Sequence, residues 1–295
     1  MAFVSFIRTA LASWRDYPLD PGAVLRQRYT VQCLLGEGSY GLTYLAVDSQ
    51  DGSQVAVKQA RPSKGALANH LLTREAEVLR TLQHPNLPSF REHVTGGRES
   101  SHLLIMSYLQ GDTLEELIFG QGQRFDERRC AAITLQLLEL VNYIHSKGYV
   151  HLDLRIPNVL FREGGIQLID FGLARRIGEP PLAQPSPRRA GWNRWLGNPR
   201  SLPRKAAEPA SDLEDIGHFM LFMLYSMYEP ETAADTGAAD APEPSWQEEL
   251  EISAEMRHMI ERLLQLQSPY PDTASFTKEL QVFSSSQWPD STEGR

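Results

Sequence analysis

The stretch 150–172 contains the residues whose chemistry is most readily interpreted. It reads VHLDLRIPNVLFREGGIQLIDFG and places Asp153, Arg155 and Asn158 on one loop, with Asp170 on a second turn after a short apolar strand. One carboxylate on such a loop can take the proton of an acceptor hydroxyl, while a second carboxylate and an amide hold magnesium. The pattern therefore indicates ATP-dependent phosphoryl transfer.

These two loops resemble the catalytic loop, H-R-D-L-K-x-x-N, and the magnesium loop, D-F-G, of eukaryotic-type protein kinases. The resemblance implies that Asp153 aligns a serine or threonine hydroxyl and accepts its proton. Arg155 stands where most relatives carry lysine and would neutralise the γ-phosphate. Asn158 and Asp170 would coordinate Mg²⁺, or Mn²⁺ in its place, through oxygen atoms. Any one of these alone could be a polar loop residue, but the ordered set favours a site.

A glycine-rich turn, GEGSYG, lies between two short apolar runs at 30–35 and 43–47. Gly36, Gly38 and Gly41 allow the backbone to approach a phosphate closely. A plain hairpin turn is the alternative interpretation. Because a strand and not a helix follows the turn, the resemblance implies a flap over ATP phosphates.

The run 55–58 reads as a central strand ending in Lys58, which in this resemblance contacts the α- and β-phosphates; a surface lysine is the alternative. A helix is predicted over 71–82, and Glu75 matches the glutamate that pairs with this lysine. Glu77 is the rival candidate. Glu75 shares an apolar helix face, whereas Glu77 points about 200° away from it.

The resemblance also implies an adenine pocket, for which simple core packing is the alternative reading of each residue. Its apolar plates would be Leu35, Ala56 and Leu160, with Met106 at the back and Ser107, Tyr108 and Leu109 offering backbone hydrogen bonds. Thr43 stands at a roof position where the family usually has valine.

Two features depart from the family pattern. Leu152 replaces the arginine that in many kinases clamps a phosphorylated residue. The segment 173–205 contains no threonine and only Ser186 and Ser201 as phosphorylation sites. Constitutive activity or control by a partner is therefore expected.

The Ala-Pro-Glu element is also missing, although Asp212 and Gly217 in SDLEDIG resemble the start of the family's buried central helix. The corresponding region near the C-terminus, 263–276, contains no arginine that could pair with the missing glutamate. Because both partners of that buried pair are absent together, the fold is expected to remain stable. Because this element is missing, the sequence gives no prediction of the structure of the peptide-binding platform or of the substrate preference.

Composition bounds the partners and the compartment. A formal net charge of -8 argues against general nucleic-acid binding. A basic cluster within 188–205 would receive an acidic protein or a nucleic-acid strand, or is merely a solvated loop. Cys33 and Cys130 lack metal spacing, which predicts free thiols in a reducing, cytoplasmic compartment. The longest apolar run, 216–228, is too short to span a bilayer.

The resemblance implies an α+β, bilobal, protein-kinase-like fold: a small, mainly antiparallel β N-lobe with one key helix, and a larger, mainly helical C-lobe. An amphipathic helix is predicted over 1–20, docking on this chain or binding a partner or a membrane surface. The lobes are predicted over 21–109 and 110–283, with a flexible acidic insertion at 229–244 and a polar tail at 284–295.

The resemblance covers residues 29–280 and is closest to soluble bacterial serine/threonine kinases of eukaryotic type. The expected function is γ-phosphoryl transfer from Mg-ATP to serine or threonine hydroxyls of proteins, including the chain itself. Two alternatives stay open from the residues: a small-molecule phosphotransferase of the aminoglycoside or choline kinase type, and an ATP-binding pseudokinase scaffold.

Overall fold

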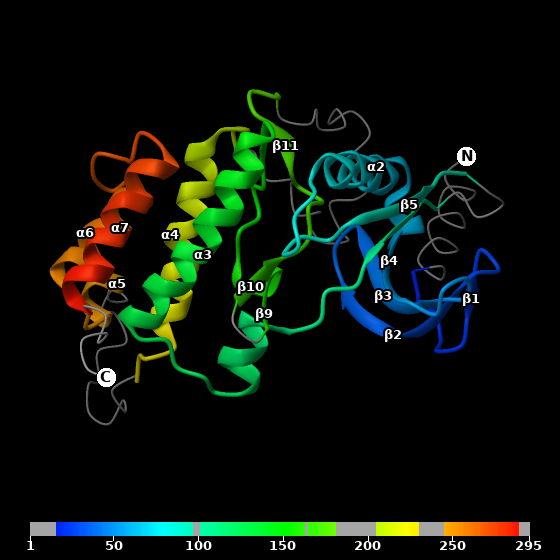
Figure 1. The fold of residues 1–295 in the computed structure, drawn as a ribbon, viewed down its shortest axis with the longest axis horizontal. Helices are drawn as coiled ribbons and strands as arrows, with labels where there is room; N and C mark the ends of the chain where they lie inside the picture. The colour runs from blue at the N-terminus through cyan, green and yellow to red at the C-terminus, as the bar shows by residue number, and fades with distance from the viewer. Residues whose placement is uncertain (1–15, 97–100, 163–164, 181–204, 230–244, 289–295) are drawn as a thin grey trace, which may run out of the picture. The chain divides into compact units, whose positions relative to one another are not determined.

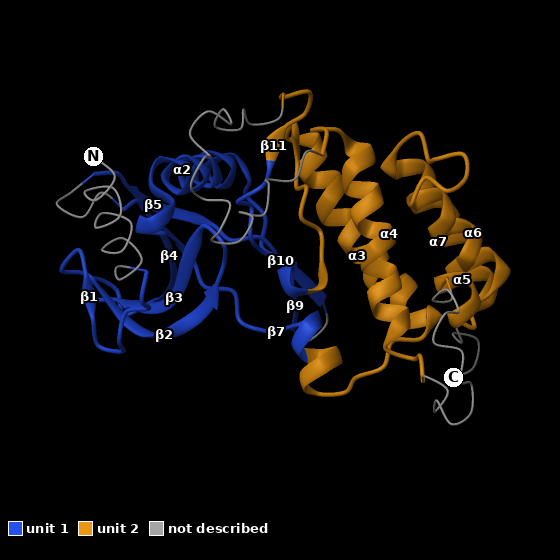
Figure 2. Ribbon diagram, turned by 180° about the vertical axis from the view of Figure 1, so that it is seen from behind, with its two compact units in different colours: residues 1–116, 157–174 blue, residues 117–156, 175–295 orange. Residues whose placement is uncertain are grey.

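A computed structural model describes residues 16–96, 101–162, 165–180, 205–229 and 245–288 (Figure 1). The chain forms two compact units (Figure 2): unit 1 comprises residues 1–116 and 157–174, and unit 2 comprises residues 117–156 and 175–295. Unit 1 holds an antiparallel sheet with one long helix, and unit 2 is mainly helical. This confirms the expected α+β class with a β-rich part and a helical part.

The sheet of unit 1 has six strands in the order β1-β2-β3-β4-β6-β5, and every neighbouring pair is antiparallel. The strands are β1 (Val24–Leu25), β2 (Tyr29–Glu37), β3 (Gly41–Asp48), β4 (Gln54–Ala60), β5 (Phe90–Val94) and β6 (Leu103–Ser107). In β3 the alternation of the sequence buries Leu42, Tyr44 and Ala46 on one face. In β4 the residues 55–57 are all buried, as expected for a central strand.

Helix α2 (Gly65–Thr81) packs against β4, β5 and β6 of this sheet, after a 3-10 turn η1 (Pro62–Lys64). It buries one face, which includes Leu71, Leu72 and Leu79 together with Glu75. The helix begins six residues before the predicted range of 71–82. Because α2 packs on one face of the sheet, a glutamate on its buried side can contact those β4 side chains that point toward that face.

A second, smaller sheet of unit 1 joins β7 (Asp112–Thr113) to the hairpin of β9 (Val159–Arg162) and β10 (Gly165–Leu168). The hairpin pairs Val159 with Leu168, so the residues just before β9 and just after β10 lie at the same end. A Cβ at Gly111 would come 2.6 Å from the Phe161 carbonyl oxygen, so only glycine allows β7 to approach β9 this closely.

Unit 2 is built on helices α3 (Glu127–Ser146) and α4 (Pro209–Tyr225), which contact each other and lie side by side in Figure 1. Helix α7 (Thr273–Gln287) packs on α3, and α6 (Ala254–Leu263) packs on α4. Unit 2 also contains α5 (Trp246–Glu249) and the strand pair β8 (Tyr149–Val150) and β11 (Arg175–Arg176), while the π-helical turn η2 (Glu116–Gly120) and the 3-10 turn η3 (Ile156–Asn158) each include residues of both units. Asp126, Ser253 and Asp272 each accept a backbone N–H at the start of α3, α6 and α7.

Several sequence predictions lie wholly or largely outside the described residues. These are the N-terminal helix up to residue 15, the acidic insertion after Glu229 and the basic cluster before Lys205. Residues 16–20 are described and contact the sheet region: Asp16 Oδ1 accepts the Ser63 N–H at 3.0 Å, and the Leu19 N–H donates to the Tyr44 hydroxyl at 3.2 Å. The lobe limits 21–109 and 110–283 stay predictions, and helix α7 extends through Gln287, into the predicted polar tail.

Within the described part of the chain, no helix combines the length and the apolar character needed to cross a bilayer.

Phe276 of α7 is fully buried, with its ring centroid 5.0 Å from that of Tyr270. Phe276→Ala is expected to lower the free energy of unfolding by about 3 to 5 kcal/mol, because apolar burial is lost and a cavity remains. Urea denaturation measures this. Val282→Ala on the same helix removes a side chain that is 62% exposed, and should stay within about 0.5 kcal/mol. Equal losses in the two variants would contradict the assignment of this helix face.

Candidate active site

Lys58 lies between two carboxylates in unit 1. Its Nζ is 2.8 Å from Glu75 Oε2 and 2.7 Å from Asp170 Oδ1. The Lys58 side chain is 14% exposed and that of Glu75 is 2% exposed, whereas Asp170 is 40% exposed. Two negative charges thus meet one buried positive charge, which leaves a net negative charge on the solvent-accessible side of the cluster.

Strand register and helix phase together bring Lys58 and Glu75 into contact. Lys58 is paired with Thr43 in β3 and with Leu104 in β6, so it is held in the middle of the sheet. On α2 the structure places Glu75 on the buried face, while Glu77 is exposed. Of the two candidate glutamates, only Glu75 is within ion-pair distance of Lys58.

The charges in this cluster depend on one another. Burial lowers the pKa of Lys58, but the carboxylates of Asp170 and Glu75 outweigh burial, so the pKa is raised on balance and the ammonium stays charged. Burial raises the pKa of Glu75 more than its ion pair with Lys58 lowers it. Lys58 is therefore what allows the buried Glu75 to be ionised.

The β9–β10 hairpin brings Asn158 and Asp170 to its open end, where the Ile169 N–H donates to the Asn158 carbonyl at 2.9 Å. Asp170 has a positive φ of 63°, a conformation that aspartate tolerates better than most residues. The Gly172 N–H donates to Asp170 Oδ1 at 3.1 Å. A Cβ at Gly172 would also come 3.1 Å from this oxygen, so a side chain there would press against the charged cluster.

Asp153 and Arg155 lie in unit 2, on the loop after β8. Arg155 Nε is 2.9 Å from Asp153 Oδ1, and the Arg155 side chain is 59% exposed while that of Asp153 is 19% exposed. The predicted base is therefore accompanied by the guanidinium that stands at the family's lysine position. The pair presents one carboxylate with a positive charge next to it.

The loop that carries Asp153 is held through its backbone by helix α4. The buried Asp212 accepts the N–H groups of His151 and Leu152 at 2.9 and 2.7 Å. Its carboxylate also lies 2.8 Å from His145 Nε2 of α3. Leu152, where the family has arginine, is 4% exposed and has a φ of 65°. An apolar side chain is thus accommodated in the core at this position.

The predicted flap is the β2–β3 hairpin of unit 1. The Gly38 N–H donates to the Gly41 carbonyl at 2.9 Å, and Arg61 Nε donates to the Gly38 carbonyl at 2.8 Å. At Gly41 a Cβ would lie 3.1 Å from the Gln59 carbonyl oxygen, whereas a Cβ at Gly36 would meet nothing within 4 Å. The hairpin is therefore tied to the end of β4 at its tip.

The residues predicted to surround adenine also lie in unit 1. Ala56, Met106 and Leu160 are each 7% exposed, and Ala56 is paired with Met106 across β4 and β6. Leu35 is 42% exposed. The Ser107 N–H donates to the Ser89 carbonyl at 2.9 Å, so this one backbone donor of the three predicted hinge residues already has a partner within the protein.

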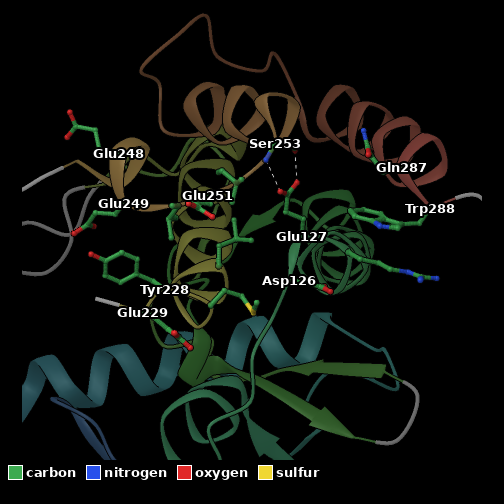
Figure 3. A pocket seen from close by; sticks show the side chains of 15 residues that line it. Asp126, Glu127, Tyr228, Glu229, Glu248, Glu249, Glu251, Ser253, Gln287 and Trp288 are labelled. Carbon is green, nitrogen blue, oxygen red and sulfur yellow. Dashed lines mark hydrogen bonds between the residues drawn. The ribbon is translucent and has the colours of Figure 1, made fainter. Parts of the chain in front are cut away.

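A pocket of about 930 Å³ in unit 2 is lined by none of the predicted residues (Figure 3). Its wall is rich in carboxylates, and two of them bind residues of other helices. Glu127 accepts both the N–H and the hydroxyl of Ser253, at 2.7 and 2.5 Å, and Glu249 accepts the Tyr225 hydroxyl at 2.5 Å. They join helices to one another, and no catalytic role is assigned to them.

The roles of Gly172, Asp212 and Asp215 were not predicted. Asp212 and Asp215 stand three residues apart among the buried residues of a helix that is mainly apolar. Two carboxylates on one face of such a helix must accept hydrogen bonds from buried donors. The spacing of these two aspartates in an apolar run is the signal in the sequence that could have indicated such contacts.

Comparisons with known proteins agree with this geometry. The family model described as protein kinase domain matches residues 29–274. The chain is 30% identical over 268 residues to the probable serine/threonine-protein kinase YbdM of Bacillus subtilis (strain 168), covering 90% of this chain and 93% of that protein. It is 37% identical over 150 residues to cyclin-dependent kinase 10 of Homo sapiens, covering 50% of this chain and 41% of that protein.

Lys58→Met leaves Glu75 buried without its cation. Breaking a buried pair typically costs about 3 to 5 kcal/mol, and we expect about 3 kcal/mol here because the partly exposed Asp170 keeps its water. Since the folded-state pKa of Glu75 is already raised, protonated Glu75 favours folding at low pH, and this contribution is lost as the pH rises. The loss of stability should therefore be largest at pH 8 and smallest near pH 5, as measured by urea denaturation.

Arg124→Met is the control, since Arg124 pairs at 2.6 Å with Glu229 and the two side chains are 53% and 73% exposed. This surface pair should contribute less than about 1 kcal/mol. A loss in Lys58→Met that is no larger than in the control, or that does not vary with pH, would contradict the buried charge cluster.

Proposed function

The chain belongs to the protein kinase family, and we propose that it transfers the γ-phosphoryl group of Mg-ATP to serine and threonine hydroxyls of proteins, its own among them. The observation that carries this proposal is the contact of Lys58 with both Glu75 and Asp170. Three elements far apart in the sequence supply these charges, and phosphoryl transfer needs each of them. A relative named as a serine/threonine-protein kinase and aligned over 90% of the chain supports a hydroxyl acceptor.

Asn158 and Asp170 are the proposed magnesium ligands, and their chemistry fits that ion. Both supply oxygen atoms at one end of the β9–β10 hairpin, and the Asp170 side chain is 40% exposed. Among the described residues no group of three or more histidine, cysteine, aspartate or glutamate side chains forms a metal cage. Mg²⁺ typically binds through one or two protein oxygens together with substrate phosphates and water. When bound, it would neutralise charge on the β- and γ-phosphates.

Each remaining residue has a proposed task. Lys58 binds the α- and β-phosphates, and Glu75 holds its side chain in place. Gly36, Gly38 and Gly41 let the flap backbone approach the phosphates. Adenine lies against apolar and backbone groups: Leu35, Thr43, Ala56, Met106, Ser107, Tyr108, Leu109 and Leu160.

In the proposed reaction the acceptor oxygen forms a bond to the γ-phosphorus while the bond from that phosphorus to the β–γ bridging oxygen breaks. ADP leaves, and the hydroxyl proton passes to Asp153. Arg155 contacts Asp153 and would supply positive charge next to the phosphoryl group during transfer.

Asp153→Asn is expected to lower the rate of protein phosphorylation at least about 100-fold, because the acceptor hydroxyl loses its base. Transfer of label from [γ-³²P]ATP to protein measures the rate, and titration calorimetry should show ATP affinity within about twofold, since Asp153 does not bind the nucleotide. Asp51→Asn, at an exposed turn, serves as control.

Two outcomes would contradict the proposed function. Label that appears on an aminoglycoside or on choline and not on protein would indicate a small-molecule phosphotransferase. Unaltered protein that binds ATP but phosphorylates nothing would indicate a scaffold.

Removal of divalent metal by a chelator should abolish transfer, and added Mg²⁺ should restore it. Asp170→Asn removes a charged ligand and is expected to raise the Mg²⁺ concentration for half-maximal activity about tenfold or more. An unchanged Mg²⁺ titration in this variant would exclude Asp170 as a ligand.

A further inference from the structure

In unit 2 the first and the last described residues of the segment between the magnesium loop and α4 are hydrogen-bonded to each other. Three consecutive carbonyls, of residues 205–207, each accept a hydrogen bond. The Arg175 guanidinium donates to the first, the Ser211 hydroxyl to the second at 2.8 Å, and the Gly178 N–H to the third at 2.8 Å. The end of the segment is therefore fixed just before α4 begins.

Lys205, at this fixed end, forms an ion pair with Asp215 of α4. Asp215 is 8% exposed, and it also accepts the N–H of Leu154 at 3.4 Å. Asp212, one helical turn earlier, accepts the N–H groups of His151 and Leu152. The two carboxylates thus hold the main chain on both sides of Asp153, and Lys205 supplies the cation that this pair of buried negative charges needs.

We propose that Asp215 and Lys205 form a latch that positions the catalytic loop without phosphorylation of the segment. The latch acts through the backbone: Lys205 keeps Asp215 ionised and oriented toward the Leu154 N–H, and this contact sets the main chain that carries Asp153. Because Leu152 stands at this position, the loop has no arginine that would bind a phosphorylated residue of the segment. The Lys205–Asp215 pair connects the segment to the loop instead. Both residues are positioning residues, and the inference rests on the proposed kinase function.

The Lys205–Asp215 latch is expected to make the activity depend on pH. Burial raises the pKa of Asp215 to about 6, against the opposing effect of Lys205, and Asp212 raises it further. The charged groups that face Asp215 are Lys205 from the segment end and Asp212 from its own helix, and His145 of α3 faces Asp212. Since the ionised form is the one that binds Lys205, activity should fall as the pH drops through about 6.

The test compares Lys205→Met, Lys205→Arg, Asp215→Asn and the double variant Lys205→Met/Asp215→Asn in the full chain. Phosphorylation of protein by ATP is measured from pH 5 to 8.5, with ATP affinity measured separately. We expect Lys205→Met to lower kcat about tenfold, with the KM for ATP within about twofold and the acid midpoint shifted upward. Lys205→Arg should retain kcat and the midpoint. Lys278→Met, at an exposed position of α7, is the control.

Asp215→Asn should lose the acid limb, and the double variant should be no worse than this single variant, because both changes break one interaction. Phosphatase treatment of the unaltered protein should leave its activity unchanged. The latch is refuted if Lys205→Met and Lys205→Arg behave alike, if the two losses add, or if the treatment abolishes activity. If Lys205→Met does not fold, the comparison of Lys205→Arg with Asp215→Asn across the same pH range still decides.

Failure of this inference is distinguishable from failure of the proposed function. Unaltered protein that transfers no phosphate under any condition refutes the function. Active protein whose rate and pH profile do not respond to changes at Lys205 refutes the latch alone.

Discussion

The contact of one buried ammonium with two carboxylates is the interaction on which the site of unit 1 depends. Lys58 comes from the central strand, Glu75 from α2, and Asp170 from the turn after the β9–β10 hairpin. Neither Lys58 nor Glu75 is stable as a charge at its depth alone, since an isolated buried charge is strongly unfavourable. Helix, sheet and hairpin are thereby required to keep their positions relative to one another. The surplus negative charge lies at Asp170, the most exposed of the three, where a divalent cation is proposed to bind.

Unit 2 also contains buried charges that need partners, but there the buried charges are carboxylates. There the catalytic loop brings backbone N–H groups into the interior, and α4 meets them with Asp212 and Asp215. Two carboxylates one turn apart repel each other, so His145 and Lys205 next to them are part of the arrangement. In both units the polar groups that are proposed to take part in catalysis are oriented by a buried charge that is itself held by a second element.

The fold class and the lysine–glutamate contact were predictable because local pattern determines them. The buried run of β4 ends at Lys58, and helical periodicity places Glu75 and not Glu77 on the inner face. The hairpin that unites Asn158 and Asp170 follows from two short apolar strands. By contrast, Lys205 meets Asp215 and Arg155 meets Asp153 through side-chain orientation, which spacing does not encode. The contact of Asp215 with Leu154 spans 61 positions, so only the tertiary fold reveals it.

The carboxylates of α4 bind main-chain atoms, and every amino acid except proline presents the same N–H group. The hydrogen bonds by which the helix holds the loop at positions 151, 152 and 154 therefore involve no side chain of the loop. This gives the loop room to change its sequence: an arginine can be exchanged for a leucine that turns into the core, with no loss of the hydrogen bonds that shape the loop. The contacts that support the loop are thus separate from any contact that the side chain at position 152 would make.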